Sequence, residues 1–590
     1  MPKALRAPQW RWTSRQARSS PASGATTTNK GFCAQRRPID PSNSTRNRHM
    51  HLLEEPWIPV LRRDGARAWV TLAQMSDPDI VAFDAPRADF NGALAQFMVG
   101  LLQTTTPAAS QVQWRRLLLT PPDAATLADW FAPHAAAFTF DGPGARFMQD
   151  FDLRASDGDP VGIGALLIEA PGENAVKNNS DLFIKRGHVT RLCPHCAALA
   201  LFTLQVNAPA GGAGHRTGLR GGGPLTTLLV ADGGPEAPRS LWQTLWLNVR
   251  HQQDFLAGDA GEGHEAPHYT FPWLASIAAI QQEGGQTTPV QVHPAHVYWA
   301  MPRRIRLDMD ACSAGTCDLC GRSSDALIER YVTRNYGLNY KGAWLHPLSP
   351  YYEAKDGLLP LHPQPDGLGY RHWLSWVLGM QSDKRKVVRA SVIEQFLSGD
   401  VEHRSGIGLR LWAFGYDMDN MKARCWYEST LPLYQLADCS PAAQQSLREE
   451  VGAWLQGAEL AVSYLRGAVK DAWFSQDARG DFSFVDATFW GRTEAAFYEL
   501  LRARIQAPAG TDRVATAERW LRHLIDTALH LFDHDWVGSG PVERMNPARV
   551  AAAHRLLRAS LNGPKLRAAL ALEVPAKAGK KASVKPSKKA

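Results

Sequence analysis

The chain has 590 residues, of which 44% are hydrophobic, enough for two or more domains with sizeable cores. No apolar run approaches the ~18–20 residues that a membrane-spanning helix needs, which argues against an integral membrane protein. The formal net charge of +8 is concentrated at the two ends. Residues 1–49 contain ten Lys or Arg and one acid, and residues 577–590 contain six lysines and no acid, which leaves 49 basic and 56 acidic residues between them. A uniformly basic nucleic-acid-binding surface is therefore excluded, and any contact with DNA or RNA must come from local basic loops.

Both ends of the chain have the composition of disordered segments. Residues 1–49 are rich in Arg, Ser, Thr and Pro; they could mimic a mitochondrial transit peptide but lack the apolar stretch of a secretion signal. We expect a disordered basic extension there, with the native start at Met50, and a disordered lysine-rich tail over 574–590. Eight cysteines in a chain of this length do not form a disulfide framework, so we expect a reducing, cytoplasmic compartment.

The first ordered part of the sequence predicts a large, irregular α+β domain over residues 50–435. Alternation in 57–60 and 69–72 predicts a hairpin that turns at Arg63-Asp64-Gly65. Residues 89–102 then predict an amphipathic helix. Short strands, loops and helices continue to about Leu431, with many Gly and Pro and no internal repeat.

The composition changes after Ser440-Pro441, where a good N-cap is followed by proline at the first helical position. Four long apolar-periodic segments follow: 440–474, 484–506, 511–536 and 546–572. Because short loops join four long helices, we predict a C-terminal four-helix bundle over residues 436–573.

Two CxxC pairs, Cys193-Pro-His-Cys196 and Cys317-Asp-Leu-Cys320, predict one tetrahedral thiolate site. Each pair can place two sulfurs along one edge of a Zn²⁺ site with Zn–S bonds near ~2.3 Å. Gly321 follows the second pair, where a knuckle turn commonly needs positive φ. We therefore predict a structural zinc ion held by Cys193, Cys196, Cys317 and Cys320 that staples two distant segments.

Other interpretations of these cysteines remain open. The pairs could be unrelated reduced thiols, and Cys312 is a spare thiol that could replace a ligand. A redox role is disfavoured because neither pair is expected to follow a strand and open a helix, as thioredoxin-like motifs do.

Three segments have the composition of loops that contact nucleic acid. Residues 171–191 are polar, with four basic residues around an apolar Leu182-Phe183-Ile184; they fit either a loop that orders on binding or a mobile linker. Residues 210–223 are rich in glycine, which allows close approach and leaves N–H groups free for phosphates, although a flexible loop has the same composition. Residues 414–424 predict a turn that presents Asn420 and Met421, either an ordinary strand-to-strand turn or a wedge into a base step.

The order of the motifs along the whole chain resembles that of one known family. The chain is similar to CasA, the family of large subunits of the type I-E CRISPR surveillance complex Cascade, over about residues 50–573. The matching segments are LLEEPWIPV (52–60), APRADF (85–90), RFMQDF (146–151), CPHC with the following stretch to Leu228, WAMPRRIRL (299–307), CDLCG (317–321), WLHPLSPYY (344–352) and FGYDMDNMKARCWYE (414–428).

This resemblance implies a non-catalytic subunit with a mixed N-terminal domain and a C-terminal four-helix bundle. It implies recognition of the protospacer-adjacent motif in duplex DNA and the start of strand separation for the guide. The implied partners are the other Cascade subunits, the CRISPR guide RNA, double-stranded target DNA and a recruited helicase-nuclease that docks partly on this subunit. No membrane is implied.

The resemblance also assigns roles to individual residues. A basic position after the second CxxC falls by spacing on Asn335, so Arg334 is our candidate for it. The implied DNA-binding residues are Ala210, Gly211, Gly212, Ala213, Gly214, Arg334, Asn420 and Met421. The implied mobile loop near the guide and a neighbouring subunit contains Lys177, Asn178, Asn179, Phe183, Lys185 and Arg186.

Two interpretations from other classes compete with this one. A metal-dependent hydrolase would rest on His534 and Asp535 with nearby His523, His530 and Asp533, although a solvated or partly buried helix end explains them more simply. A plain scaffold would keep the zinc and the helices without contacting DNA. The pair His293-x-x-His296 has no partner motif, and we interpret it as structural.

Overall fold

The computed structural model of the protein describes most of the chain. The described residues are 49–181, 186–212, 214–233, 239–256, 264–355, 357–365, 367–382, 385–398, 408–419, 421–434, 440–474, 480–507, 512–539 and 546–574. All of them belong to one compact unit, His49–Ala590. The predicted basic extension, apart from His49, and the lysine tail from 575 onward lie outside the described residues. No helix in the described ranges is long and apolar enough to cross a membrane.

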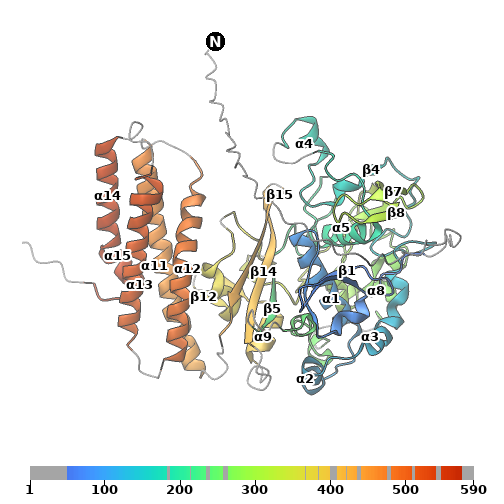
Figure 1. The fold of residues 1–590 in the computed structure, drawn as a ribbon, viewed down its shortest axis with the longest axis horizontal. Coiled ribbons are helices and arrows are strands. Elements are labelled where there is room, and N and C mark those ends of the chain that lie inside the picture. The colour runs from blue at the N-terminus through green and yellow to red at the C-terminus, as the bar shows by residue number, and fades with distance from the viewer. Residues whose placement is uncertain are drawn as a thin grey trace, which may run out of the picture. The chain divides into compact units, whose positions relative to one another are not determined.

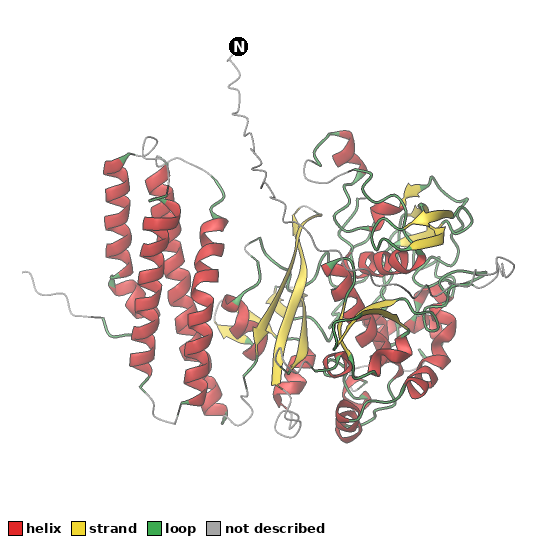
Figure 2. Ribbon diagram, viewed as in Figure 1, coloured by secondary structure: helices red, strands yellow, loops and turns green. Residues whose placement is uncertain are grey.

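The strands form several small antiparallel sheets rather than one large sheet (Figure 2). In strand order these are β2(Arg67–Val70)–β1(Ile58–Arg62)–β3(Ile80–Phe83); β11(Gly357–Pro360)–β10(Tyr351–Ala354)–β13(Arg385–Val388)–β12(Met380–Ser382); β15(Lys422–Pro432)–β14(Gly408–Asp419)–β5(Thr226–Asp232); β4(Val161–Gly162)–β9(Arg330–Arg334)–β6(Arg304–Leu307); and β7(Ser313–Thr316)–β8(Ser323–Leu327). Most of the helices before residue 440 are short. They are α1(Ala88–Thr105), α2(Gln111–Leu119), α3(Ala124–Phe131), α4(Glu173–Lys177), α5(Pro194–Asn207), α6(Leu241–Trp246), α7(Gln252–Phe255), α8(Pro267–Thr270) and α9(Ser391–Ser398). The predicted mixed α+β class is confirmed.

The predicted first hairpin is present, but the predicted character of the following helix is wrong. Strands β1 and β2 pair with Ile58 opposite Val70, and Gly65 in the turn has a φ of 84°. Helix α1 is buried around almost its whole circumference, so it is a central core helix and not an amphipathic one. The reason is that α5, α6 and the turn at 294–298 surround it. At Gly92 a Cβ atom would lie 2.8 Å from the Phe414 ring of β14, so only glycine allows this approach.

Buried tryptophans form much of the core. Eight of them are almost completely shielded from solvent: Trp57, Trp242, Trp246, Trp273, Trp299, Trp373, Trp454 and Trp520. Several donate their indole N–H to a backbone carbonyl; Trp57, for example, donates to Leu52 at 2.7 Å. The high tryptophan content therefore serves packing. Seven of these eight indole nitrogens donate a hydrogen bond, and that of Trp454 has no acceptor among the described residues.

The C-terminal part consists of long helices that pack along one another (Figure 1). They are α11(Pro441–Trp473), α12(Ser483–Gln506), α13(Arg513–His530), α14(Pro547–Leu561) and α15(Pro564–Ala569). As predicted, Ser440 caps the first helix and accepts from the backbone N–H of Ala443 at 3.2 Å. A π-helical turn over Leu531–Trp536 continues α13.

The last predicted helix, 546–572, is in fact two helices. It breaks at Asn562-Gly563, where Gly563 has extended backbone angles of −81° and 164°. Pro564 causes the break, because proline lacks an N–H and disfavours a helical residue before it.

The C-terminal helices pack directly onto the mixed part of the chain. The hydroxyl groups of Tyr370 and Thr493 lie 2.8 Å apart in a buried hydrogen bond. The turn at 370–372 contacts α12, and the segment 374–378 contacts α11. The division into a domain over 50–435 and a bundle over 436–573 therefore remains a prediction.

Candidate zinc centre and nucleic-acid interface

The four predicted cysteine ligands come together. Their sulfur atoms all lie within 4.8 Å of one another, and the sulfurs of Cys193 and Cys320 are 3.7 Å apart. A tetrahedral Zn²⁺ with Zn–S bonds of ~2.3 Å requires sulfur separations of about 3.8 Å. The donor set and its spacing therefore fit a structural zinc ion.

The second arm of this centre is built as the predicted knuckle, whereas the first arm is the start of α5. The turn of the β7–β8 hairpin carries Cys317 and Cys320, and the N–H of Gly321 donates to the carbonyl of Cys317 at 3.0 Å. Gly321 has a φ of 70°, the left-handed conformation that the sequence predicts. The first arm is held by a two-way backbone pairing of Leu192 with Ile328, at 3.0 and 2.8 Å.

Asp318, inside the second CxxC, ties the two arms to each other. Its carboxylate accepts from the backbone N–H of Thr190 at 2.7 Å and of Arg191 at 3.0 Å, two residues before Cys193. The Thr190 hydroxyl adds a third bond at 2.9 Å. The hydrogen bond from the Thr190 backbone N–H is the main cause that lowers the pKa of Asp318, because it favours the ionised carboxylate.

The sequence argument against a redox role holds for the preceding strand, because no described strand leads directly into Cys193, but it is wrong for the helix. Cys193 is the N-cap of α5, so the first pair does open a helix, with Pro194 at its first position. Hydrogen bonds from the Cys193 thiol, and then from Cys196, lower the pKa of Cys317 and bring that of Cys320 to about 7, whereas the hydrogen bond with Cys193 is the main cause that raises the pKa of Cys196. The four-sulfur cluster, rather than the titration of any one thiol, favours a metal over a dithiol pair.

The remaining cysteines lie outside the centre. Cys312 donates to the carbonyl of Met309 at 3.3 Å and is not a member of the four-sulfur group, so the structure does not support it as a substitute ligand. Cys425 is exposed on β15. Cys33 and Cys439 lie outside the described residues.

The glycine segment forms a tight, exposed turn directly after α5. The N–H of Gly211 donates to the carbonyl of His215, and the N–H of His215 donates to Gly212, both at 3.2 Å. Gly212 and Gly214 have φ of 93° and 76°, and no described residue accepts a hydrogen bond from their N–H groups. Ala210 opens this turn, while Ala213 lies outside the described residues. The turn thus offers side-chain-free backbone donors, as predicted.

The segment after β9 packs against this turn. The N–H of Tyr336 donates to the carbonyl of Gly214 at 2.7 Å, and a Cβ on Gly214 would lie 2.5 Å from the Cβ of Asn335. Arg216 stacks over the Tyr336 ring with 5.6 Å between the guanidinium carbon and the ring centre. Arg334 is exposed, and it donates to the backbone carbonyl of Asp157. Asn335 therefore contacts the glycine turn directly, whereas Arg334 does not.

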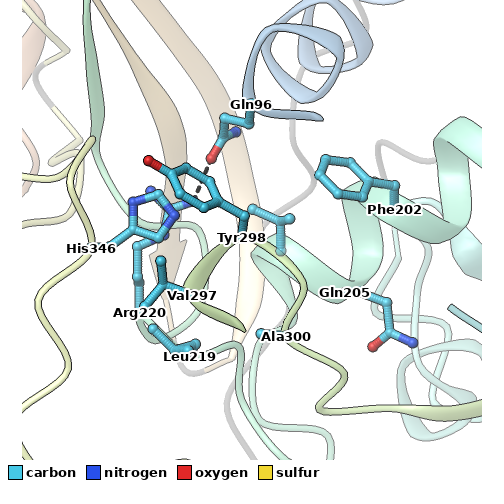
Figure 3. A pocket seen from close by; sticks show the side chains of 10 residues that line it. Gln96, Phe202, Gln205, Leu219, Arg220, Val297, Tyr298, Ala300 and His346 are labelled. Atoms are coloured by element: carbon cyan, nitrogen blue, oxygen red, sulfur yellow. Dashed lines mark hydrogen bonds between the residues drawn. The ribbon is translucent and has the colours of Figure 1, made fainter. Parts of the chain in front are cut away.

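A buried arginine anchors the far end of the glycine segment. The Arg220 guanidinium donates to the hydroxyls of Thr226 at 3.0 Å and Ser349 at 2.9 Å, and to the side-chain oxygen of Gln96. Figure 3 shows Arg220, Gln96, Tyr298 and His346 among the residues that line a small cavity of about 10 Å³. Burial without a carboxylate partner among the described residues lowers the pKa of Arg220 to about 10. The glycine segment is therefore fixed to α1 and β5 by hydrogen bonds from this guanidinium to uncharged side chains.

Strands β14 and β15 form a long two-stranded ribbon (Figure 1), and Met421 directly precedes the first residue of β15. Strands β14 and β15 pair from Arg410–Pro432 to Asp419–Lys422, so a two-residue turn joins them. Met421 is 57% exposed and has a φ of 66°, which is strained for a residue with a side chain. Asn420 lies outside the described residues. Close to the tip, Arg424 is paired with Asp417 at 2.8 Å, so its charge is partly neutralised.

The predicted mobile loop is closed by Arg186. Its guanidinium donates to Asp181 at 2.5 and 2.6 Å, to the Asn179 side chain at 3.0 Å and to the carbonyl of Val176 at 2.9 Å. Lys177 ends α4, Asn178 caps it, and Asn179 has a φ of 50°. Phe183 and Lys185 lie outside the described residues.

The histidines of the hydrolase hypothesis do not assemble a metal site. Asp535 is paired with Arg492 at 3.3 Å, and His530 and His534 pack ring to ring at 4.7 Å. Within the described ranges, only the four cysteines form a group of three or more potential ligands. His296 is buried with both ring nitrogens satisfied, by the Tyr269 carbonyl at 2.9 Å and the Tyr340 hydroxyl at 3.1 Å, which confirms a structural role.

Two residues that sequence reasoning missed shape these sites. Asp318 joins the two arms of the cysteine centre through hydrogen bonds, and its position inside the second CxxC could have indicated this role from the sequence. Arg303 lies beneath the glycine turn, where its guanidinium donates to the carbonyl of Pro209. Nothing in its local sequence context indicates this contact.

Comparisons with known proteins agree with this fold. The profile of the family described as CRISPR-associated protein Cse1 matches residues 51–531. The crystal structure of CasA from Thermus thermophilus aligns with a TM-score of 0.62 at 17% identity, covering 87% of this chain and 99% of that chain. Cse1 from Acidimicrobium ferrooxidans aligns with a TM-score of 0.60 at 20% identity, covering 88% and 99%. A chain of a CRISPR RNA-guided surveillance complex aligns with a TM-score of 0.62 at 16% identity, covering 87% and 99%.

Proposed function

Because the chain belongs to the CasA/Cse1 family of CRISPR-associated proteins, we propose that it is a non-catalytic subunit of a type I-E RNA-guided surveillance complex. In this role it recognises the protospacer-adjacent motif on duplex DNA and starts strand separation for the guide RNA. Its partners are the other Cascade subunits, the guide and the target duplex. A separate helicase-nuclease degrades the target after docking partly on this subunit.

The observation that carries the proposal is the glycine turn at 211–215. The N–H groups of Gly212 and Gly214 have no acceptor among the described residues, and Arg216 and Arg303 lie beside and beneath the turn. The minor groove presents a degenerate pattern of base edges, so a backbone turn that senses groove shape accepts several related motifs rather than one. Between its two basic ends the chain has more acidic than basic residues, so binding DNA requires local basic side chains such as these two arginines.

The hairpin tip gives the proposal its second element. An apolar side chain held at a strained tip can insert between base pairs, and unstacking one step costs a few kcal/mol. Guide–target pairing then continues as a near-balanced strand exchange, so the initial opening is the step that the protein has to assist. In this proposal Met421, with Asn420, is the wedge.

The zinc centre has a supporting role in this proposal. When bound, the ion would join the start of α5 to the β7–β8 hairpin through its four cysteine ligands. Helix α5 ends at Asn207, and the glycine turn follows within four residues. The cysteine centre thus holds the start of α5 in place, and through this helix it fixes the orientation of the glycine turn relative to the bound DNA.

Base opening next to the motif tests the proposal. A fluorescent adenine analogue placed beside the motif reports unstacking when the guide-loaded complex binds. We expect an increase in fluorescence with the wild-type subunit and little increase with Asn420→Ala/Met421→Ala. Metal-dependent DNA cleavage by the pure protein, abolished by His534→Ala, would instead support the hydrolase hypothesis.

A further inference from the structure

Arg303 is locked in place by helix α5. Its backbone N–H donates to the Gln205 side-chain oxygen at 3.0 Å, and the Gln205 side-chain nitrogen donates back to the Arg303 carbonyl at 3.0 Å. The same Gln205 nitrogen donates to the carbonyl of Met148 at 3.2 Å. Because Gln205 is nearly completely buried, this two-way bond sets where the Arg303 side chain begins.

The Arg303 guanidinium fills the space directly beneath Gly211. It donates to the carbonyl of Pro209, and a Cβ on Gly211 would lie 2.7 Å from one of its terminal nitrogens and 3.3 Å from the other. Gly211 is not in the left-handed region, so its backbone conformation does not require glycine. The contact with the guanidinium, together with that of His215 on the same side, requires it. Only the main chain of the turn therefore separates this cation from whatever lies on the outer surface.

The charge of Arg303 has no counter-charge in the described protein. The side chain is 8% exposed, no described carboxylate lies within ion-pair distance, and its Nε has no hydrogen-bond acceptor. Burial, and then the charge of Arg303, lowers the pKa of the neighbouring His215, so this histidine adds no counter-charge. A buried cation without a partner is costly, and proteins usually compensate such charges. The outer surface of the turn is the side from which a compensating anion can approach.

We propose that Arg303 is the residue that positions the glycine turn from beneath and supplies its positive charge, which a phosphodiester of bound DNA completes. This inference rests on the proposed DNA-binding function and names a residue that acts there without needing to touch a base. It also explains why position 211 is a glycine, because any side chain there would displace the Arg303 guanidinium.

The test measures binding of a motif-bearing duplex by the assembled guide-loaded complex over a series of salt concentrations. Each phosphate that a cation neutralises contributes about −0.9 to the slope of log K against log[salt] for duplex DNA. We expect Arg303→Gln to reduce that slope by roughly this amount. Arg306→Gln is the matched control: it removes one charge from the same segment, where Arg306 instead lies near the carbonyl of Gly144 at 3.4 Å. Its slope should equal that of the wild type.

A second variant separates charge from positioning. Arg303→Lys keeps the charge but lacks the planar fork that both reaches Pro209 and lies flat beneath Gly211. We expect it to retain the salt slope while losing several-fold discrimination between duplexes with and without the motif. If Arg303→Gln does not assemble into the complex, Arg303→Lys decides alone, and discrimination equal to the wild type overturns the proposal.

The outcomes also separate this inference from the proposed function. If the wild-type complex discriminates motifs but Arg303→Gln keeps both affinity and slope, the inference is overturned and the proposed function stands. If the wild-type complex shows no dependence on the motif, the proposed function fails and the inference fails with it.

Discussion

The backbone N–H of Tyr336 donates to the carbonyl oxygen of Gly214 across 2.7 Å. This bond joins the glycine turn after α5 to the segment after β9, and both segments follow a CxxC pair of the zinc centre. Tyr336 has a φ of 63°, an unusual conformation for a residue with a side chain, which brings its N–H to the turn. The candidate DNA-contacting surface is thus assembled from two parts of the chain that the cysteine centre fixes.

Replacing one ligand from each arm of the cysteine centre tests the zinc assignment. We expect about one zinc ion per wild-type chain and a marked loss in Cys193→Ser and Cys317→Ser, measured by elemental analysis. Structural zinc contributes directly to folding, so both variants should also lose several kcal/mol of unfolding free energy.

Cys425→Ser is the control for those variants, because Cys425 is exposed on β15 and outside the four-sulfur group. It should retain the wild-type metal content and stability. Unchanged zinc content in Cys193→Ser and Cys317→Ser would reject the site.

Removing the Arg220 guanidinium should destabilise the protein. Arg220→Met leaves the oxygens of Gln96, Thr226 and Ser349 without this donor in a buried region. Each buried group left unpaired costs about 1–3 kcal/mol, so we expect a total loss of about 2–4 kcal/mol after partial rearrangement. Urea denaturation of the isolated protein measures it.

Arg67→Met provides the comparison for Arg220. Arg67 is 78% exposed and paired with Asp84 at 3.0 Å, and such surface pairs contribute less than about 1 kcal/mol. Equal effects of the two substitutions would show that the buried network around Arg220 has no special importance.

Met421→Gly should stabilise the isolated protein while weakening base opening in the complex. Glycine relieves the positive φ at the tip, which costs a residue with a side chain about 1–2 kcal/mol. The same change removes the proposed wedge. Denaturation of the protein and fluorescence of a base analogue beside the motif measure the two effects separately.

The matched variant for strain is Ala571→Gly. Ala571 follows α15 with a φ of 55°, so glycine there relieves similar strain far from the hairpin in sequence. It should stabilise the protein without changing base opening. If Met421→Gly opens the duplex as well as the wild type does, Met421 is not a wedge.

Stability should fall as the pH falls from 6.5 toward 4, in part because of His296. Burial lowers the pKa of His296 to about 4, whereas an unfolded histidine titrates near ~6.5. Between these values the unfolded state binds the proton and the native state does not, so acid favours unfolding by up to about 1.4 kcal/mol per pH unit. His296→Gln should flatten this dependence, as urea denaturation between pH 7 and pH 5 would show. A slope identical to that of the wild type would contradict this assignment.

The sequence predicted the parts of the structure that depend on local patterns and on strict chemistry. The two CxxC spacings were enough to predict that Cys193 and Cys317 lie close together in space, although more than a hundred residues separate them in sequence. A tetrahedral metal ion needs four ligands, and the two pairs together supply them. The Ser440 cap and the hairpin turn at Gly65 follow from local preferences of the backbone. Both are confirmed.

Other features depend on which distant segments meet, and the sequence could not show them. Helix α1 appeared amphipathic, but its polar positions such as Gln96 are buried against partners from elsewhere in the chain. The contact of Arg303 with Gly211 depends on the length of α5, because the end of this helix determines where the glycine turn lies. The break at Gly563-Pro564 is a different case, because its local signal is present in the sequence and the prediction of one continuous helix overlooked it.

The central claim is that this subunit gives the surveillance complex its dependence on the motif. The most direct measurement compares binding of target duplexes that differ only in the flanking motif, by the guide-loaded complex with and without the subunit. We predict that motif-dependent binding requires the subunit and is lost with Asn420→Ala/Met421→Ala. Equal binding of both duplexes by the complex lacking the subunit would contradict the account and leave the protein as a scaffold.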